Sequence, residues 1–522
     1  MSNLVDTNGW HTVAAITYSD VNAAIAASGK KPDGFKVVAS DESASADAKF
    51  GAWGLAIGGS GPDINMQIQL TGGSITGPFG HAGAQATLPI ASCTFPIIVR
   101  ANYIPHTDKV LNLVLDGAAP VQVGSYIGTQ PTSSFLANAA LQELLQQWLT
   151  TNIEEFNVVF ASVDLDAEYE SDGLTWLKPS YRGYAVSEPA TSPSLDNSVF
   201  AVLCLVDGAT PPAGLAYAVS PFAIPTGAKA AFLISNEKFL EHMMFAALPV
   251  MFNNISPGSA QDYFSIGNDG TQITNKTSLQ LKDVKLDNGH VVNPNIDTSN
   301  FSIQLDGAQI IFSLIDMKFE FSAGITVHLN YEGRAILQYD KPHQILDLSV
   351  VVQSGSGSVE VSEGLQIAEY VMGGIAIVAA VVSGIGGIVA KSATAAVEGA
   401  SATISVAEQL GEDEALAGQA TVTALRGLIS GTPAEVSQIA ARAMAVARIG
   451  MIAGFVSGLM PGIATIMKAV AESDYQSMPK ITDLTSAAIG KTVIWPKAVG
   501  SFQLDSAQLN GSLQFGLVKA GQ

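Results

Sequence analysis

The sequence predicts an α+β protein in which one antiparallel sheet is interrupted by a helical insertion. Two observations lead to this fold class. Apolar and polar residues alternate with period two over several long stretches, as in strands with one dry and one wet face. Residues 362–473, in contrast, are rich in alanine and show helical spacing. Because the alternation resumes after residue 473, we expect the helices to be inserted into the sheet and not to form a tandem domain.

The composition describes a large and acidic protein with enough apolar residues for an extensive core. Of the 522 residues, 48% are hydrophobic and 14% are charged, which is too apolar for a disordered chain. With 25 basic against 46 acidic residues, the formal net charge is −21. Such a charge repels phosphate backbones and anionic lipid surfaces alike, so we expect no nucleic-acid partner.

The cysteines and the N-terminus indicate in which cellular compartment the protein is made. Cys93 and Cys204 are the only cysteines, which excludes a disulfide framework and the ligand spacing of a zinc site and favours a reducing compartment. The first residues, MSNLVDTNGW, have neither the basic region nor the apolar region of a secretory signal. We therefore expect the protein to be cytoplasmic as synthesised, with any release following a non-classical route.

Residues 1–227 are predicted to form an N-terminal α+β half. The stretch INMQIQL alternates as a strand does. An amphipathic helix is expected after Ser134, with Leu141 and Leu145 in its apolar stripe. The Pro- and Gly-rich residues 210–227 are the predicted boundary of this half.

The second half, residues 228–361 together with 474–522, is predicted to be an antiparallel sheet. A helix N-capped by Ser235 precedes its strands and carries Phe239 and Met243 on an apolar stripe. Turn-forming links such as YEG are expected to join successive strands. The apolar strand positions of interest are Leu279, Leu281, Met317, Phe319, Phe321, Ile325, Val327 and Leu329.

The predicted insertion contains two long uncharged runs, residues 370–390 and 449–467. The first is rich in glycine and alanine and lacks leucine, so we expect no stable transmembrane span. In the second, four glycines at i+4 steps predict close packing against another helix; they are Gly450, Gly454, Gly458 and Gly462. Three interpretations stay open, namely two buried helices packed together, a membrane-inserting hairpin, and an interface with a partner.

The sequence contains no motif typical of catalysis or metal binding. There is no HExxH, no Walker loop and no GxSxG elbow. The Gly/Ser runs GGSGPD, residues 58–63, and SGSGS, residues 354–358, lack the strand–loop–helix context of a phosphate site and are expected to be loops. The seven histidines are scattered, and the acidic pairs of DLDAEYESDG lack the glycine and the glutamate of a calcium loop. We therefore expect no catalytic residue, no metal site, no cofactor and no enzyme activity.

Two stretches resemble the landmarks of a known family. NGWHTVAAITYSDVNAAIA resembles the opening of the P-forty-seven family, found with the OrfX proteins in clostridial neurotoxin gene clusters and in insect-active bacteria. The matching residues are Gly9, Trp10, Val13, Val21, Asn22 and Ile25, whereas His11 departs from the acidic residue expected after the tryptophan. Residues 234–249 are similar to the second landmark, an Ile-Ser followed by a helix with phenylalanine and apolar steps.

The resemblance implies a fold of the tubular lipid-binding (TULIP) type, in which an elongated, highly curved antiparallel sheet wraps around long helices. It implies a protein that binds a lipid or another hydrophobic ligand and serves a bacterial toxin system as an accessory, with other toxin-complex proteins as further partners. The apolar strand positions, with Phe239 and Met243, would then face the ligand. The alternatives are a membrane-inserting toxin component that uses residues 370–390 and 449–467, and a scaffold whose tube is filled by its own side chains.

Overall fold

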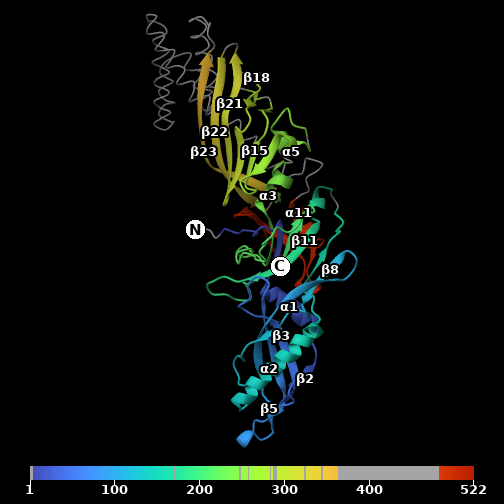
Figure 1. Cartoon of the computed structure of the whole chain (residues 1–522). Coiled ribbons are helices and arrows are strands. Elements are labelled where there is room, and N and C mark those ends of the chain that lie inside the picture. The colour runs from blue at the N-terminus through green and yellow to red at the C-terminus, as the bar shows by residue number, and fades with distance from the viewer. Residues whose placement is uncertain are drawn as a thin grey trace, which may run out of the picture. The chain divides into compact units, whose positions relative to one another are not determined.

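The computed structural model describes the chain in two compact units (Figure 1). The described residues are 4–169, 172–245, 248–256, 258–282, 284–285, 291–322, 325–341, 345–361 and 481–521. Met1–Ser235, Lys341–Gln344 and Gln476–Gln522 form the N-terminal unit, and Asn236–Asp340 and Ile345–Tyr475 form the second unit. The predicted insertion 362–473, with its two apolar runs and with Gly450, Gly454, Gly458 and Gly462, lies outside the described residues.

The N-terminal unit is built on an antiparallel central sheet that joins strands from near both ends of the chain. In order across the sheet, these strands are β11 (Pro179–Ser187), β12 (Val199–Val206), β1 (Thr12–Thr17), β13 (Ala230–Ile234), β26 (Leu513–Lys519) and β25 (Phe502–Leu509). Strand β13 lies between β1 and β26, so Ala231 pairs with Ala15 and Phe232 pairs with Phe515. The sequence assigned 474–522 to the second half, but these ladders place the C-terminal strands in the N-terminal unit and move its boundary to Ser235.

The middle strands of the central sheet are buried on both faces. Every residue of β1, β12 and β13 is buried, so their peptide groups depend on the strand ladders for hydrogen bonds. Alternate side chains enter two separate cores. Ile16 and Val202 belong to the larger core, and Val13 and Leu203 belong to the smaller one.

A second sheet of the N-terminal unit curves against a long helix (Figure 1). Its order is β2 (Gly34–Val38), β3 (Ser45–Leu55), β4 (Ile64–Gly77), β6 (Cys93–Val99) and β9 (Gln122–Val123), with β5 (Ala86–Ile90) also paired to β4. The helix, α2 (Phe135–Asn152), begins after Ser134, whose side chain accepts a hydrogen bond from the Ala137 N–H. Leu141 and Leu145, on the apolar stripe of this helix, are fully buried, as the amphipathic spacing predicts. An antiparallel sheet that curves against a long helix confirms the expected α+β fold class.

The remaining elements of the N-terminal unit pack around these two sheets. They are α1 (Tyr18–Ser28), α11 (Ile481–Ala488), the sheet β24 (Val493–Ile494), β10 (Ala161–Asp164), β8 (Val110–Leu115) and β7 (Ala101–Pro105), and 3₁₀ turns at His81–Gly83, Ile153–Phe156, Asp172–Leu177 and Lys497–Val499. Helix α1 is capped by Thr17, whose side chain accepts from the Asp20 N–H. Asp20 is buried and pairs with Lys519 Nζ at 2.5 Å, which joins α1 to β26.

Trp10, which belongs to the first family landmark, connects the loop 210–227 to the central sheet through a hydrogen bond and ring contacts. Its indole Nε1 donates to the Ala216 carbonyl at 2.8 Å. Its ring stacks on Tyr181 at 5.9 Å between centroids and meets the edge of Tyr217 at 5.6 Å. A Cβ on Gly183 would lie 2.8 Å from the Trp10 ring and 2.7 Å from the Tyr217 ring, so only glycine fits beneath this cluster.

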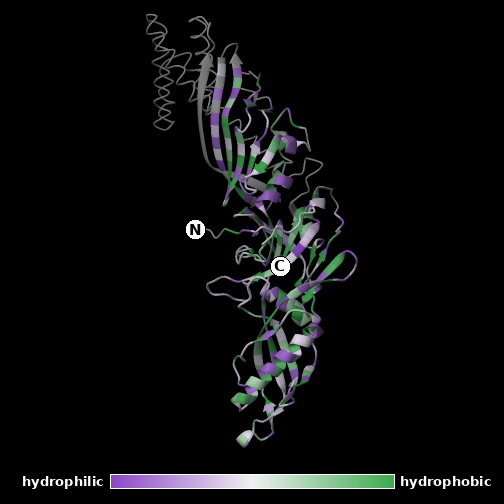
Figure 2. Cartoon of the chain, in the orientation of Figure 1, coloured by the Kyte–Doolittle hydropathy of each residue, from purple (hydrophilic) through white to green (hydrophobic). Residues whose placement is uncertain are grey.

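The second unit contains an antiparallel sheet with three long strands. Its order is β23 (Ile345–Val361), β22 (Ile325–Asp340), β21 (Gln309–Ser322), β20 (Phe301–Asp306), β15 (Gln272–Asn275) and β14 (Phe264–Gly267). Short strands β16 (Leu279–Gln280) and β19 (Asn295–Ile296) pair with each other, β19 also pairs with β21, and β17 (Val284–Lys285) pairs with β18 (Val291–Val292). The short helices are α3 (Asn236–Phe239), the π-helix η4 (Leu240–Met244), η5 (Leu248–Val250) and α5 (Ala260–Tyr263). Figure 2 shows the alternation of hydrophilic and hydrophobic residues along β21 and β22.

Two stretches that the sequence analysis assigned to connections are strand in this sheet. SGSGS, residues 354–358, lies within β23, and YEG, residues 331–333, lies within β22. In the register, Gly355 pairs with Tyr331 and Gly357 pairs with Leu329. Small residues can lie in a strand when their partners across the ladder are large. Glycine and serine content alone therefore led to the wrong prediction of a loop at residues 354–358.

The close packing of Gly183 against Trp10 and Tyr217 predicts that Gly183→Ala destabilises the protein by overpacking. The added methyl group meets two aromatic rings that cannot both move without losing their contacts, so we expect a loss of about 1 to 3 kcal/mol in the free energy of unfolding. Urea unfolding would measure this loss. Gly267→Ala in β14 is the control, because a Cβ there meets nothing within 4 Å. Equal stability of the two variants would contradict the prediction.

The two buried thiols are predicted to be unreactive in the folded protein. Burial raises the pKa of Cys93 to about 11 and the pKa of Cys204 to about 12, and the thiolate is the reactive form. A colourimetric thiol reagent at pH 8 should therefore modify neither residue before denaturant is added and both residues afterwards. Rapid labelling of either cysteine in the folded protein would show that the core around it opens.

Candidate functional site

The candidate site is an apolar face of the second unit, made by neighbouring strands. Leu279 pairs with Ile296 across β16 and β19, and Asn295 pairs with Lys318 across β19 and β21. One residue along this antiparallel register, Ile296 lies beside Met317. Leu279, Ile296 and Met317 therefore form a row across three strands. All three are buried, with at most 1% of each residue exposed.

A second row follows two residues further along the strands. The Leu281 N–H donates a hydrogen bond to the Pro294 carbonyl. Continued from Asn295 and Lys318, the antiparallel register places Pro294 beside Phe319 of β21. Leu281 and Phe319 are buried as well. We refer to Leu279, Leu281, Ile296, Met317 and Phe319 together as the apolar face. Four of these five residues were predicted from the sequence.

The other strand positions predicted for the site continue these rows in the backbone register. Leu329 pairs with Met317 and Val327 pairs with Phe319, while Ile325 pairs with Ser322. Phe321 lies in β21, one residue before Ser322. For Phe321, Ile325, Val327 and Leu329 the structure describes the strand positions and not the side chains.

Phe239 and Met243 come from the helical segment α3–η4 and are both buried. Phe245, which follows this segment, contacts Phe264 at 6.3 Å between ring centroids. Phe264 in turn contacts Phe301 at 5.5 Å, so the helical segment is joined to β14 and β20 through aromatic rings. The structure therefore places Phe239 and Met243 in the core of the same unit as the apolar face.

A β-bulge in β21 decides which residues reach the apolar face. The pairing with β22 shifts between Leu314 and Met317, and Asp316 has a positive φ of 49°. Buried positions change there from even to odd numbers, since Phe312 and Leu314 are buried before the bulge and Met317 after it. Ile315, at the bulge, is 54% exposed.

The opposite face of β21 is polar and carries ion pairs. Lys318 Nζ lies 2.5 Å from an Asp297 carboxylate oxygen, and this hydrogen bond raises the pKa of Lys318. His328 Nδ1 lies 2.6 Å from Asp316 Oδ1. The sheet is therefore amphipathic, with charge on one side and the apolar face on the other.

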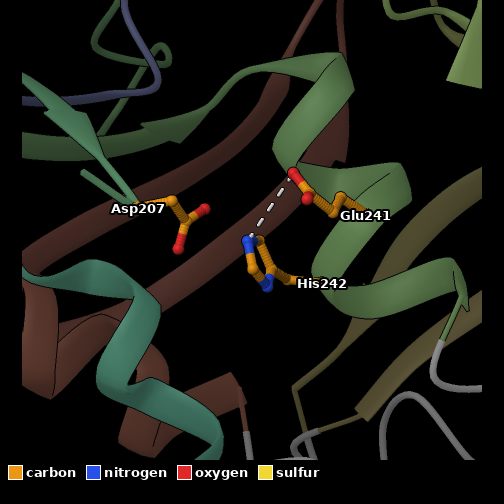
Figure 3. Close-up of side chains that lie close together, drawn as sticks. All are labelled: Asp207, Glu241 and His242. Atoms are coloured by element: carbon orange, nitrogen blue, oxygen red, sulfur yellow. Dashed lines mark ion pairs between the residues drawn. The ribbon is translucent and has the colours of Figure 1, made fainter. Parts of the chain in front are cut away.

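An acidic residue and a histidine lie together on η4 (Figure 3). The His242 Nε2 is 3.8 Å from Glu241 Oε2, and the buried Lys238 Nζ is 2.6 Å from the same oxygen. Asp207, also drawn in Figure 3, belongs to the N-terminal unit. Within the second unit, Glu241 already balances an ammonium group, and with His242 it supplies fewer ligands than a structural metal site uses.

None of the helices in the described part of the chain combines the length and the hydrophobicity that crossing a bilayer requires. The runs 370–390 and 449–467 are not in that part.

Ile296 is the residue of the apolar face that the sequence analysis missed. It lies in a strand of two residues, too short for an alternating pattern. Its position in the apolar face follows from the pairing of β19 with both β16 and β21, which the sequence pattern does not contain.

Comparison with known proteins supports the resemblance seen in the sequence. A family model described as OrfX-like, "Protein OrfX2/OrfX3/P47", matches residues 7–427. The chain is 28% identical over 341 residues to "Protein OrfX3" of Paraclostridium bifermentans, covering 58% of this chain and 66% of the relative. It is 26% identical over 337 residues to "Protein OrfX3" of Clostridium botulinum (strain Kyoto / Type A2), covering 57% and 66%. The match spans just under two thirds of each relative.

Solved structures share the fold over nearly the whole chain. P47 from Clostridium botulinum A2 gives a TM-score of 0.58 with 12% identity, covering 98% of each chain. P47 of Clostridium botulinum E1 gives a TM-score of 0.58 with 14% identity, covering 99% of this chain and all of the other. At these identities the likeness concerns the fold alone. Because the family model spans well over half of the sequence, the chain belongs to the OrfX-like family of OrfX2, OrfX3 and P47 proteins.

Proposed function

We propose that the protein binds a lipid or another hydrophobic ligand and is not an enzyme. The observation that supports this function is the apolar face of the second unit, where two rows of large side chains run across β16, β19 and β21. Charge is kept to the other side of β21, as the pair of Lys318 and Asp297 illustrates. A sheet with this polarity can enclose an acyl chain against its apolar side if the ligand replaces part of the packing there.

The energetics of such binding are favourable for an ordinary acyl chain. Each buried methylene contributes about 0.8 kcal/mol, so half-burial of a chain of about 16 carbons contributes roughly 6 kcal/mol. Burial of nearly the whole chain contributes about 12 to 13 kcal/mol, which gives micromolar binding once an association cost of about 4 kcal/mol is subtracted. Binding of an acyl chain in this way requires no catalytic group. Ionisable groups near the apolar face form ion pairs with each other, as Asp316 does with His328.

The family resemblance extends the proposal to the biological setting. Because P-forty-seven and OrfX proteins resemble this chain and occur in clostridial neurotoxin gene clusters, we infer an accessory role in a bacterial toxin system. Other proteins of such a system are then the partners to test, together with the hydrophobic ligand. The proposed ligand site does not depend on that setting.

Lipid capture is tested first on the purified protein. We expect mass spectrometry of an organic extract to detect a bound lipid, or the lipid-free protein to take up a fluorescent fatty acid or phospholipid with micromolar affinity. Protein that carries no lipid and takes up none of these probes would overturn the proposal and favour a scaffold filled by its own side chains.

Val327→Trp should reduce probe uptake at least about fivefold while the fold stays intact. Val327 pairs with Phe319 of the apolar face, and a bulky ring there occupies space that the ligand needs. Thr326→Trp is the matched control, because successive residues of a strand point to opposite faces of the sheet. Equal uptake by both variants, with unchanged circular dichroism, would show that the ligand does not use this face.

A further inference from the structure

The second sheet of the N-terminal unit has an unusual distribution of charge. In a protein with 71 charged residues and a net charge of −21, residues 64–99 and 117–142 contain no Asp, Glu, Lys or Arg. Together these segments make β4, β5, β6, β9 and the first turns of α2. The charged groups of the chain are therefore kept out of one continuous part of the fold.

The two uncharged segments lie side by side. Strand β6 pairs with β4 and β9, so Ile98 is opposite Gln122. Beyond β9, the Ile127 N–H donates to the Thr94 carbonyl at 2.8 Å. The Ala91 N–H donates to the Pro131 carbonyl at 2.7 Å, just before the cap of α2. These bonds place the start of α2 next to the chain that leaves β5.

Large apolar side chains project from this uncharged region into solvent. Phe135 is 82% exposed and Leu136 is 65% exposed, at the first two positions of α2. Ile127 is 50% exposed. We call Phe135, Leu136 and Ile127 the neutral patch. Ile98 is 37% exposed but is not counted, because Arg100, two residues further along the chain, pairs with Asp63 at 2.7 Å. Figure 2 shows apolar residues at one end of α2, next to β5.

Packing does not explain the exposed pair at the start of α2. The buried stripe of the helix begins at Ala137 and continues through Leu141, so the helix would be held without Phe135 and Leu136. Its first charged residue is Glu143, about 12 Å further along the axis at 1.5 Å per residue. The exposed acidic residues Asp41 and Glu42 lie in the β2–β3 turn, at the opposite edge of the sheet from β6 and β9.

We propose that the neutral patch docks the protein onto an electrically neutral phospholipid bilayer. Phe and Leu side chains that project from a helix end enter the boundary between headgroups and acyl chains, where aromatic residues are favoured. Strong negative charge elsewhere disfavours an anionic surface, and the patch has no basic residue that would attract one. The two segments contain no carboxylate, so none of their own side chains adds the desolvation cost that a carboxylate would have at a zwitterionic surface.

This inference concerns the N-terminal unit and does not depend on the proposed ligand site in the second unit. It gives a specific signature. Binding should be retained at high salt, because no ion pairs with headgroups contribute to it. Adding anionic lipid should weaken binding, in contrast to proteins that dock through basic clusters.

The test is flotation of the full chain with phosphatidylcholine vesicles at low and high salt, and with vesicles that also contain phosphatidylserine. We expect binding to the neutral vesicles that changes less than about twofold with salt and falls when phosphatidylserine is added. Absence of binding to phosphatidylcholine vesicles, or binding that requires phosphatidylserine, would overturn the proposal.

The double variant Phe135→Gln with Leu136→Gln should lower the vesicle partition coefficient at least about tenfold. Leu4→Gln is the matched control, because Leu4 is 57% exposed in the same unit but outside the neutral patch. Val327→Trp should leave vesicle binding unchanged, which separates this surface from the proposed ligand site. Unchanged binding of the double variant, or a self-associated native protein that the double variant makes monomeric, would show that the patch serves another purpose.

Discussion

The constraint on which the N-terminal unit depends is the pairing of peptide groups in the middle strands of its central sheet, where neither face reaches solvent. Strands β1, β12 and β13 are buried completely, so an unmade hydrogen bond there costs far more than one at a surface. Burial on both faces also explains why the two cores on either side are distinct, since each strand contributes alternate residues to both.

The sequence predicted the elements whose pattern is local and missed those whose identity comes from their neighbours. The helix after Ser134 and the alternating strands β21 and β22 follow directly from residue spacing. Strand β12, VFAVLCLV, has no alternation because both of its faces are buried, and so it gave no period-two signal. SGSGS is strand because it pairs with β22, a partner that the local composition of SGSGS does not reveal.

The candidate site was predictable as a set of residues but not as a surface. A strict alternation run backwards from Met317 would place Ile315 on the apolar face, yet the bulge at Asp316 turns Ile315 outward. Likewise, Leu279 and Met317 belong to one row only through Ile296, which lies between them because β19 pairs with both of their strands. Such cross-strand relations depend on pairings distant in sequence, which no local pattern contains.

The position of β13 between β1 and β26 also determines when the N-terminal unit can fold. Ala230 pairs with Leu517, so the unit lacks one of its ladders until β26 has been synthesised, long after β13. During translation, β13 exposes an unpaired and entirely apolar edge while the second unit is still emerging from the ribosome. Pairings so distant in sequence fold slowly, and a chain that stops short of β26 keeps that edge open to other chains. Completion of the central sheet therefore waits for β26, which follows the whole second unit in the sequence.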